Sequence, residues 1–291
     1  MKKVIVIVGP TASGKTKLSV ELAKRVQAEI INGDSVQIYK RLNIGSAKIK
    51  PEETNGIKHH LFDIVDPKHT YSVYNFQRDV RNLINQIDIP MIVGGTGLYI
   101  KAALYDYEFD KENHHQYQTL EHLSNEALYD QLMLLDPEIK IDAQNRRRLI
   151  RALTLAKQGV LRSKKNKKDE LLYDACVIYL DLDRKVLEER LHFRLEQQLK
   201  DGFIEEVEDL LNDHISVNAI GYREIEQYLK QEISFDEMKE LIIRKSKQLA
   251  KKQKTWFKNQ MQTHIIDALD QHVIDHAYDI VKEFLNQKEH L

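Results

Sequence analysis

The segment that most restricts the fold is GPTASGKT (9–16), which fits the pattern G-x-x-x-x-G-K-[ST] of a phosphate-binding loop. It follows KVIVIV (3–8), a short run of apolar and β-branched residues, and precedes a segment whose apolar residues recur at helical spacing. In this strand–loop–helix context the loop's N–H groups and the helix N-terminus attract an anion. Lys15 is predicted to neutralise phosphate oxygens, and the Thr16 hydroxyl to ligate Mg²⁺. The predicted diphosphate- or nucleotide-binding residues are Gly9, Pro10, Thr11, Ala12, Ser13, Gly14, Lys15 and Thr16.

Beyond this loop, short apolar runs alternate with segments of helical spacing, which favours a parallel sheet covered by helices on both faces. The further predicted strands are 28–31, 89–93, 175–183 and 264–269. We therefore expect an α/β fold, with a P-loop NTPase-like parallel sheet core and an inserted helical domain. The expected division is a core at 1–195 that includes a helical excursion at about 106–172, a helical insertion at 196–245, and a return to the core at 246–291.

Composition restricts the compartment more than the ligand. The chain has one cysteine, Cys176, which excludes an intramolecular disulfide and indicates a reducing cytoplasm. No apolar run approaches the roughly 20 residues of a membrane span, so no membrane partner is expected. Lys plus Arg (44) nearly balance Asp plus Glu (45), so net charge does not indicate nucleic acid, although basic residues cluster locally at 144–151, 162–168 and 244–258.

The loop alone does not predict ATP hydrolysis. A nucleotide hydrolase normally adds an acidic residue at the end of a neighbouring strand to help hold Mg²⁺. Here the strand at 89–93 runs into GGTGLY (94–99) instead. Asp181 and Asp183, which follow the strand VIYLDLD, are explained equally well as a strand end and a helix cap.

Asp34 in GDSVQIYK (33–40) follows the second predicted strand, so it should lie at the same sheet edge as the phosphate loop. A carboxylate is repelled by a diphosphate, but it suits a proton acceptor for a second substrate. The alternative is that Asp34 only stabilises a turn or caps a helix.

A series of motifs in this chain resembles the bacterial tRNA dimethylallyltransferases, also called tRNA isopentenyltransferases. In chain order the motifs are GPTASGKT, GDSVQIY, HHLFDIVDP, YSVYNF, GGTGLY, NRRRLIRAL, AIGYRE and QLAKKQKTWF. The resemblance covers residues 3–257, and a series of this length is far more specific than a single phosphate loop.

The resemblance implies transfer of a dimethylallyl group from dimethylallyl diphosphate to N6 of the adenine just 3′ of the tRNA anticodon. The loop would then hold a diphosphate leaving group rather than ATP, with Mg²⁺ as cofactor. Carried over in the same way, Asp34 would accept the N6 proton, Thr96 would bind near the adenine, and Arg194, or as second choice Arg190, would lie over the diphosphate. Tyr39 and Tyr99 are expected either to shelter the dimethylallyl group or to belong to the core.

The resemblance also implies that basic side chains hold the tRNA anticodon arm through its phosphates. Lys247, Lys251 and Lys254 recur at helical spacing and would form one basic stripe, which otherwise reads as a solvated helix face. The helical insertion at 196–245 is expected to contact tRNA as well. The predicted tRNA-binding residues are Asp34, Ser35, Val36, Gln37, Thr96, Arg147, Arg148, Arg151, Lys247, Lys251 and Lys254.

Two other functions remain open from the residues themselves. A P-loop kinase would bind ATP and use Asp34 as the base for a hydroxyl group. A non-catalytic RNA-binding module would need the basic stripes but not Asp34. For the transferase implied by the resemblance we expect a monomer.

Overall fold

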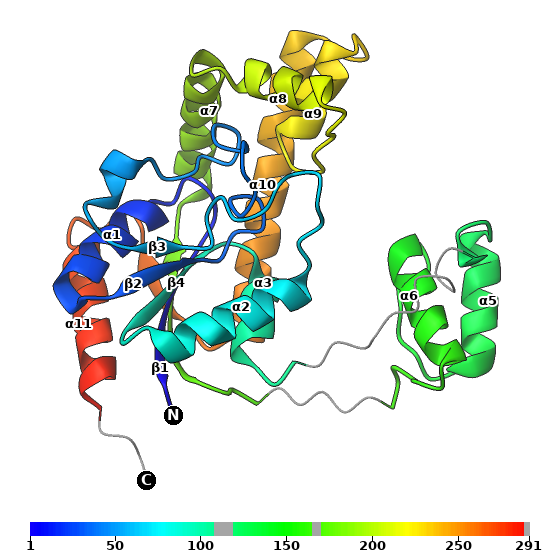
Figure 1. Ribbon diagram of the computed structural model, residues 1–291, viewed down its shortest axis with the longest axis horizontal. Coiled ribbons are helices and arrows are strands. Elements are labelled where there is room, and N and C mark those ends of the chain that lie inside the picture. The colour runs from blue at the N-terminus through cyan, green and yellow to red at the C-terminus, as the bar shows by residue number, and fades with distance from the viewer. Residues whose placement is uncertain (108–118, 165–169, 288–291) are drawn as a thin grey trace. The chain divides into compact units, whose positions relative to one another are not determined.

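One parallel sheet forms the core of the larger folded part of the chain (Figure 1). The computed structural model describes residues 1–107, 119–164 and 170–287. Within these residues six strands pair in parallel in the order β3-β2-β4-β1-β5-β6. The strands are β1 (Lys3–Val8), β2 (Glu29–Asn32), β3 (His59–His60), β4 (Pro90–Gly94), β5 (Asp174–Asp181) and β6 (His264–Asp267).

The central strand β1 explains why the sheet must be covered on both faces. Its side chains alternate between two hydrophobic clusters, because successive residues of a strand point to opposite faces. Val4, Val6 and Val8 belong to one cluster, and Ile5 and Ile7 to the other. All five are fully buried, so β1 reads as a continuous apolar run rather than an alternating one.

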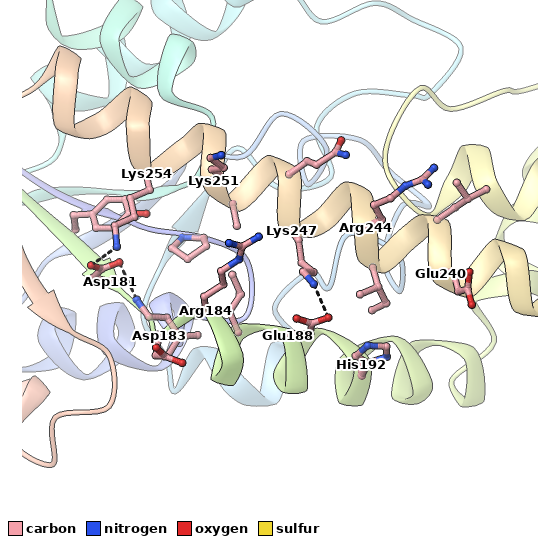
Figure 2. A pocket seen from close by; sticks show the side chains of 18 of the residues that line it. Asp181, Asp183, Arg184, Glu188, His192, Glu240, Arg244, Lys247, Lys251 and Lys254 are labelled. Carbon is pink, nitrogen blue, oxygen red and sulfur yellow. Dashed lines mark hydrogen bonds and ion pairs between the residues drawn. The ribbon is translucent and has the colours of Figure 1, made fainter.

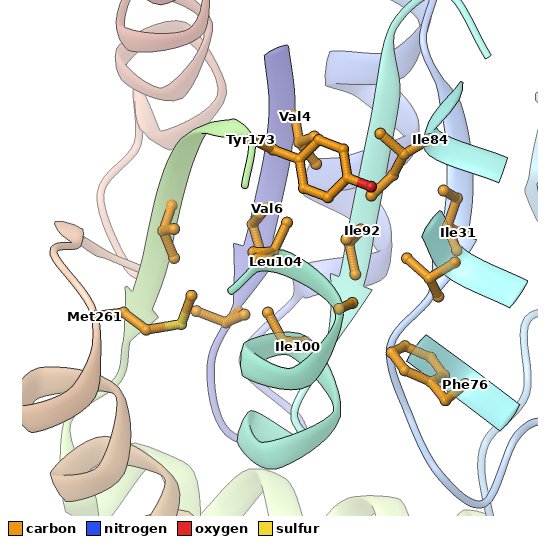
Figure 3. Close-up of a cluster of buried hydrophobic side chains, with 14 of the residues drawn as sticks. Val4, Val6, Ile31, Phe76, Ile84, Ile92, Ile100, Leu104, Tyr173 and Met261 are labelled. Atoms are coloured by element: carbon orange, nitrogen blue, oxygen red, sulfur yellow. The ribbon is translucent and has the colours of Figure 1, made fainter. Parts of the chain in front are cut away.

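Two pairs of helices cover the two faces of the sheet. α2 (Val73–Gln86) and α3 (Gly97–Leu104) bury Phe76, Ile84 and Ile100 against one face (Figure 3). α1 (Lys15–Val26) and α11 (Val273–Asn286) pack on the other face through residues that include Leu22 and Val281. The prediction of an α/β fold with a P-loop NTPase-like parallel sheet is therefore confirmed.

A third hydrophobic cluster joins the helices that follow β5. These helices are α7 (Arg184–Lys200), α8 (Phe203–Asn212), α9 (Tyr222–Leu229) and α10 (Phe235–Gln260). Leu187, Leu191 and Leu195 of α7 pack with Phe203 and Ile242 in this cluster. Phe257, near the end of α10, lies instead in the cluster that contains Val4 and Val6 of β1. α10 therefore links the helical region to the sheet.

The chain divides into two compact units. Unit 1 comprises Met1–Tyr105 and Leu171–Leu291, and unit 2 comprises Asp106–Glu170. Unit 2 contains α5 (Asn125–Leu135) and α6 (Arg146–Lys157), which pack around a small core of their own. The helical excursion expected at about 106–172 thus corresponds to unit 2, whereas the segment 196–245 groups with the sheet in unit 1.

Two aspartates of the motif VIYLDLD mark the end of β5 and the start of α7. Asp181 ends β5, and Asp183 is the N-cap of α7, where its Oδ1 accepts a hydrogen bond of 2.8 Å from the Lys185 N–H.

Sequence patterning did not predict β3, because two histidines carry no strand periodicity. In the part of the chain that is described, no helix is long and apolar enough to cross a membrane.

Candidate active site

The phosphate loop connects β1 to α1 and is arranged to receive an anion. Gly14 is the N-cap of α1 in a left-handed conformation, with φ of 92°, which favours glycine. The Lys15 Nζ donates to the Pro10 carbonyl oxygen at 2.6 Å, across the loop. The Ser13 hydroxyl is buried and has no hydrogen-bond partner among the described residues. An unpaired buried donor at this place fits a loop that binds a ligand oxygen.

The loop opens into a cavity of about 930 Å³ in unit 1. Both Lys15 and Asp34 line it, so the predicted anion-binding group and the predicted proton acceptor share one space. Among the other residues that line it are Thr11, Ala12, Gly14, Thr16, Val36, Gln37, Gly94, Gly95, Arg190, Arg194 and Gln253.

Two arginines of α7 lie at this cavity, one turn apart. The Arg190 Nη1 donates to the carbonyl oxygen of Ala12, within the phosphate loop, at 3.2 Å. The Arg194 Nη2 donates to the Ser46 carbonyl oxygen at 3.4 Å. Burial lowers the pKa of Arg194, while the nearby charge of Asp34 opposes this. Both guanidinium groups therefore flank the loop, and the assignment of Arg194 as the first choice stays a prediction.

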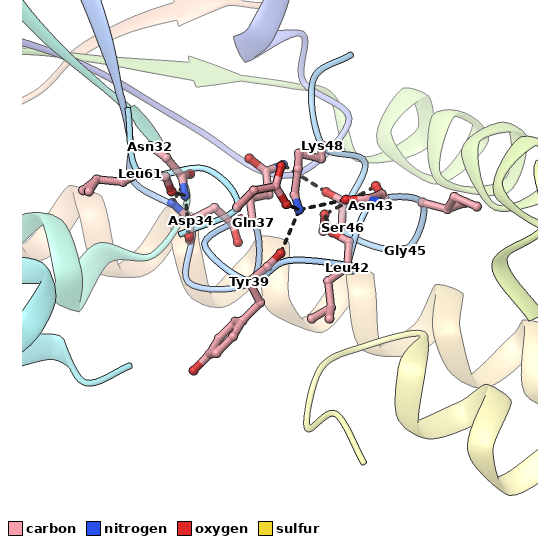
Figure 4. Close-up of polar contacts among 12 residues, drawn as sticks. Asn32, Asp34, Gln37, Tyr39, Leu42, Asn43, Gly45, Ser46, Lys48 and Leu61 are labelled. Carbon is pink, nitrogen blue, oxygen red and sulfur yellow. Dashed lines mark hydrogen bonds and ion pairs between the residues drawn. The ribbon is translucent and has the colours of Figure 1, made fainter. Parts of the chain in front are cut away.

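Asp34 is held by its own backbone and by a buried amide. Its N–H donates to the Asn32 Oδ1 at 2.9 Å, and the Asn32 Nδ2 donates to the Asp34 carbonyl oxygen at 3.0 Å (Figure 4). The Asp34 Oδ1 accepts from the Val36 N–H at 2.8 Å. Among the described residues, no donor reaches Oδ2. Asp34 thus does stabilise a turn, and the same geometry leaves one carboxylate oxygen for a substrate proton.

Thr96 lies beside this turn. Its Oγ1 accepts from the Ser35 N–H at 3.2 Å, and its own N–H donates to the Gly33 carbonyl oxygen at 3.3 Å. The turn GGTG at the end of β4 is therefore joined directly to the turn at the end of β2. The tertiary structure brings the predicted residues Asp34, Ser35 and Thr96 together, as expected for neighbouring parallel strands.

α10 lies over the GGTG turn because glycines let it approach. The Gln253 Nε2 donates to the Gly95 carbonyl oxygen at 2.9 Å. A Cβ atom at Gly97 would lie 2.3 Å from the Trp256 ring, so any other residue there would displace the indole. α10 consequently sets the position of the turn that carries Thr96.

Three residues that were expected near the substrates bind other parts of the protein itself. The Gln37 Nε2 donates to the Ser46 carbonyl oxygen at 3.0 Å. Tyr39 and Tyr99 both pack against the hydrophobic cluster that contains Val4 and Val6 of β1. The Tyr39 hydroxyl accepts from the Tyr71 N–H at 3.0 Å, and the Tyr99 hydroxyl donates to the Tyr71 carbonyl oxygen at 3.3 Å. Of the two expected roles for these tyrosines, the structure supports the one in the core.

The predicted lysine stripe does lie on one helix, α10, but carboxylates face it. Lys247 pairs with Glu188 at 2.5 Å and Lys254 with Asp181 at 2.6 Å, while Lys251 is exposed (Figure 2). All three lysines line a second cavity of about 1410 Å³, between α7 and α10. The stripe is therefore less basic than the sequence indicates, and its binding of tRNA stays a prediction.

The predicted arginines of unit 2 lie on α6. Arg147 and Arg148 are exposed and Arg151 is half-buried. Their neighbour Arg146 is structural, because its Nη1 donates to the Leu123 carbonyl oxygen at 2.6 Å. No such side-chain hydrogen bond joins either exposed arginine to the described residues of unit 2, and exposed arginines suit phosphate contacts.

A magnesium ion at this site would be bound by the Thr16 hydroxyl together with phosphate oxygens of the substrate. The described residues contain no group of three or more His, Cys, Asp or Glu that could hold a metal ion. Mg²⁺ usually keeps several waters and is bound by few protein groups together with substrate phosphates. The Thr16 hydroxyl at the start of α1 lines the cavity of the phosphate loop, so the donor set fits a phosphate-bound Mg²⁺ rather than a resident metal.

Comparison with known proteins agrees with this geometry. A family model described as IPP transferase matches residues 37–260, more than half of the chain. The chain belongs to this family. A tRNA dimethylallyltransferase of Acholeplasma laidlawii is 50% identical over 285 residues, which cover 98% of this chain and 99% of the relative. One from Onion yellows phytoplasma is 46% identical, covering 98% and 99% of the two chains.

Solved structures of the same family have the same fold. The tRNA delta(2)-isopentenylpyrophosphate transferase of Staphylococcus epidermidis is 36% identical, with a TM-score of 0.74 over 98% of this chain and 99% of that one. A eukaryotic dimethylallyltransferase, described as acting on tRNA, is 26% identical, with a TM-score of 0.86 over 99% of this chain and 82% of that one.

Sequence reasoning missed several polar residues that build the site. Asn32 is completely buried at the end of β2, and Gln198, Glu206 and Gln253 come from helices distant in sequence. A polar residue at the end of an otherwise apolar strand is a signal that could have identified Asn32. The other three carry no such signal, because their partners are backbone groups of remote loops.

Proposed function

We propose that this protein transfers a dimethylallyl group from dimethylallyl diphosphate to N6 of the adenine 3′-adjacent to the tRNA anticodon, releasing diphosphate. The observation that carries the proposal is the shared cavity. Lys15, Arg190 and Arg194 line this cavity, and so does Asp34, whose Oδ1 accepts from the Val36 N–H while no donor among the described residues reaches Oδ2. The names of the relatives support the substrate class.

On the donor side, breaking the allylic C1–O bond leaves negative charge on the diphosphate oxygens. The loop amides, Lys15 and Arg194 are placed to stabilise that charge as it develops, which is the kind of interaction that accelerates a reaction. A bound Mg²⁺, held by Thr16 and phosphate oxygens, would add positive charge at the leaving group.

On the acceptor side, N6 of adenine forms a bond to C1 and loses one proton. Asp34 Oδ2 accepts this proton, while Oδ1 remains bound to the Val36 N–H. Because the cavity lies within the protein, the adenine must leave its stack to reach the donor, at a cost of a few kcal/mol. Ser35, Val36 and Thr96 lie beside Asp34 and are proposed to contact the adenine.

Further parts of the proposal concern partners and location. We propose that the anticodon arm is held by phosphate contacts from α6 and α10, and that the protein acts as a monomer in the cytoplasm. The one cysteine, Cys176, is buried, and burial raises the pKa of its thiol to about 12, which suppresses the reactive thiolate.

The decisive experiment offers undermodified tRNA and Mg²⁺ together with either dimethylallyl diphosphate or ATP, and weighs the nucleosides of the recovered tRNA. We expect a C5H8 addition on adenosine with dimethylallyl diphosphate and none with ATP. Turnover of ATP with phosphorylation of a small molecule would select a kinase, and tRNA binding without modification would select a binding module.

The charge of Lys15 should make diphosphate binding depend on pH. Burial lowers the pKa of Lys15 to about 8, which Asp34 opposes and Arg194 reinforces. As the pH rises above about 8, the free protein loses this positive charge, so the affinity for diphosphate should fall by up to about tenfold per pH unit. Isothermal calorimetry from pH 7 to pH 9.5 measures the dependence.

Diphosphate titrates as well, so the control is Lys15→Arg, whose guanidinium stays charged over this range. Ionisation of the ligand affects both proteins equally, and the ratio of their affinities isolates Lys15. Parallel profiles for the two proteins would contradict the prediction.

The salt dependence of tRNA binding tests the α10 stripe. Lys251 is exposed, so Lys251→Gln should weaken tRNA binding and make the log–log salt slope shallower by about 0.7–0.9. Lys247→Gln should change the slope less, because Lys247 already pairs with Glu188. Filter binding from 50 to 200 mM salt measures each slope.

Lys252, an equally exposed lysine on another side of α10, provides the matched control. Lys252→Gln should leave the slope unchanged. Equal slopes for Lys251→Gln and the unaltered protein would mean that the stripe is a solvated helix face.

A further inference from the structure

One carboxylate outside the phosphate loop binds a row of backbone donors at the cavity wall. The Glu206 Oε2 of α8 accepts from the N–H groups of Asn43 and Ile44, at 2.8 and 2.7 Å. Its Oε1 accepts from the Gly45 N–H at 3.1 Å and from the Tyr222 hydroxyl at 2.7 Å. Four donors thus converge on a single side chain, which uses the full capacity of a carboxylate.

The carbonyl oxygens of the loop that Glu206 binds also accept hydrogen bonds. The Gln198 Nε2 of α7 donates to the carbonyl oxygens of Ile44 and Gly45, at 2.6 and 3.0 Å. A Cβ atom at Gly45 would lie 2.1 Å from the Phe203 ring, so the loop backbone is pressed against α8. We call residues 43–47 the wall loop; it lines the cavity of the phosphate loop (Figure 4).

The wall loop in turn holds two predicted substrate-binding residues. Its Ser46 carbonyl oxygen accepts from the Arg194 Nη2 at 3.4 Å and from the Gln37 Nε2 at 3.0 Å. A guanidinium has five N–H donors in a rigid plane, so one bond to Ser46 sets its orientation and leaves the other donors for an anion. Moving the wall loop would therefore change the position at which this bond holds the Arg194 guanidinium.

From this chain of contacts we propose that Glu206 is a positioning residue for the diphosphate site. It acts through the wall loop on Arg194 and does not touch the ligand itself. Helix α8, which lies outside the sheet, thereby determines how firmly the anion is bound. The kinetic consequence rests on the proposed prenyl transfer, whereas the binding of inorganic diphosphate does not.

The test titrates inorganic diphosphate with Mg²⁺ into Glu206→Gln by calorimetry, alongside transfer kinetics. The amide has one acceptor oxygen, so at least one N–H of the wall loop faces an NH₂ group. We expect diphosphate affinity to fall by about tenfold and the KM for dimethylallyl diphosphate to rise equally, with tRNA affinity within twofold. Glu205→Gln, the neighbouring exposed carboxylate, is the matched control and should change neither constant.

A second variant approaches the wall loop from its other side. Gln198→Ala should lower diphosphate affinity as well, and the double variant should lose less than the product of the two single effects, because both act on one loop. If Glu206→Gln does not fold, Gln198→Ala carries the test alone. Unchanged diphosphate affinity in the folded variants would overturn the proposal, and so would an equal loss of diphosphate and tRNA binding. If the variants lose diphosphate affinity as expected but the unaltered protein shows no transfer activity, the positioning role of Glu206 stands and the proposed function is rejected.

Discussion

Lys15→Ala is expected to reduce prenyl transfer by roughly 10²–10³-fold or more, with tRNA affinity within a few-fold. The Lys15 ammonium lies across the phosphate loop, where it donates to the Pro10 carbonyl oxygen. In the proposed reaction it contacts the donor's diphosphate. That is where negative charge grows as the C1–O bond breaks, so its loss acts on the transition state more than on the bound substrates. Mass spectrometry of tRNA nucleosides measures transfer, and filter binding measures tRNA affinity.

The control is Lys17→Ala, which removes an exposed lysine from the same helix, α1, directly after the loop. It should leave transfer nearly unchanged. Near-normal transfer by Lys15→Ala would refute the assignment of the loop to the diphosphate, while a parallel loss of tRNA affinity would place tRNA at the loop.

Asp34→Asn is expected to lower the single-turnover rate by about 10²–10⁴-fold, with little change in donor affinity. Asparagine keeps an oxygen for the Val36 N–H, so the turn should persist. The oxygen without a donor becomes an NH₂ group, which cannot accept the N6 proton. Rapid-quench kinetics with tRNA and donor in excess measure the rate.

Asp66 offers a matched control, because its Oδ1 accepts from the Lys68 N–H at 2.9 Å in the same type of turn at an exposed place. Asp66→Asn should have no effect on the rate. If Asp34→Asn instead weakens donor binding and keeps the rate, Asp34 serves the metal or the fold rather than the proton.

The fold could be predicted well from the sequence where local patterns are strong. The apolar run of β1 and the glycines of the phosphate loop specify strand, loop and helix with little help from the rest of the chain. The segment 196–245 was expected to be a helical insertion, and it groups with the sheet in unit 1. The helices after residue 195 have the pattern of an insertion, but their apolar faces pack with Leu42 and Leu182 of unit 1. Whether a helix joins a core depends on which surface covers its apolar face, and periodicity does not reveal that surface.

The candidate site shows the same limit. Asp34 and Thr96 were identified from motifs at the ends of predicted parallel strands, and the structure joins them through the Ser35 N–H. The lysine stripe was predicted as one helical face, and it is one. Its ion pairs with Glu188 and Asp181 were not predicted, because the partners are 59 and 73 positions apart in the sequence and such pairs give no signal of contact.

By itself the sequence determined the sheet core, the place of the phosphate loop and the side chains at the carboxyl edge. These follow from hydrophobic periodicity and from motifs whose residues are neighbours in the chain. Only the tertiary structure decided that Glu206 holds the wall loop, that Ser46 orients Arg194 and that α10 lies over the GGTG turn. The physical reason is that these contacts join side chains to backbone groups of remote segments. Any chain carries such backbone groups at every residue, so their pairing depends on packing and leaves no trace in the sequence.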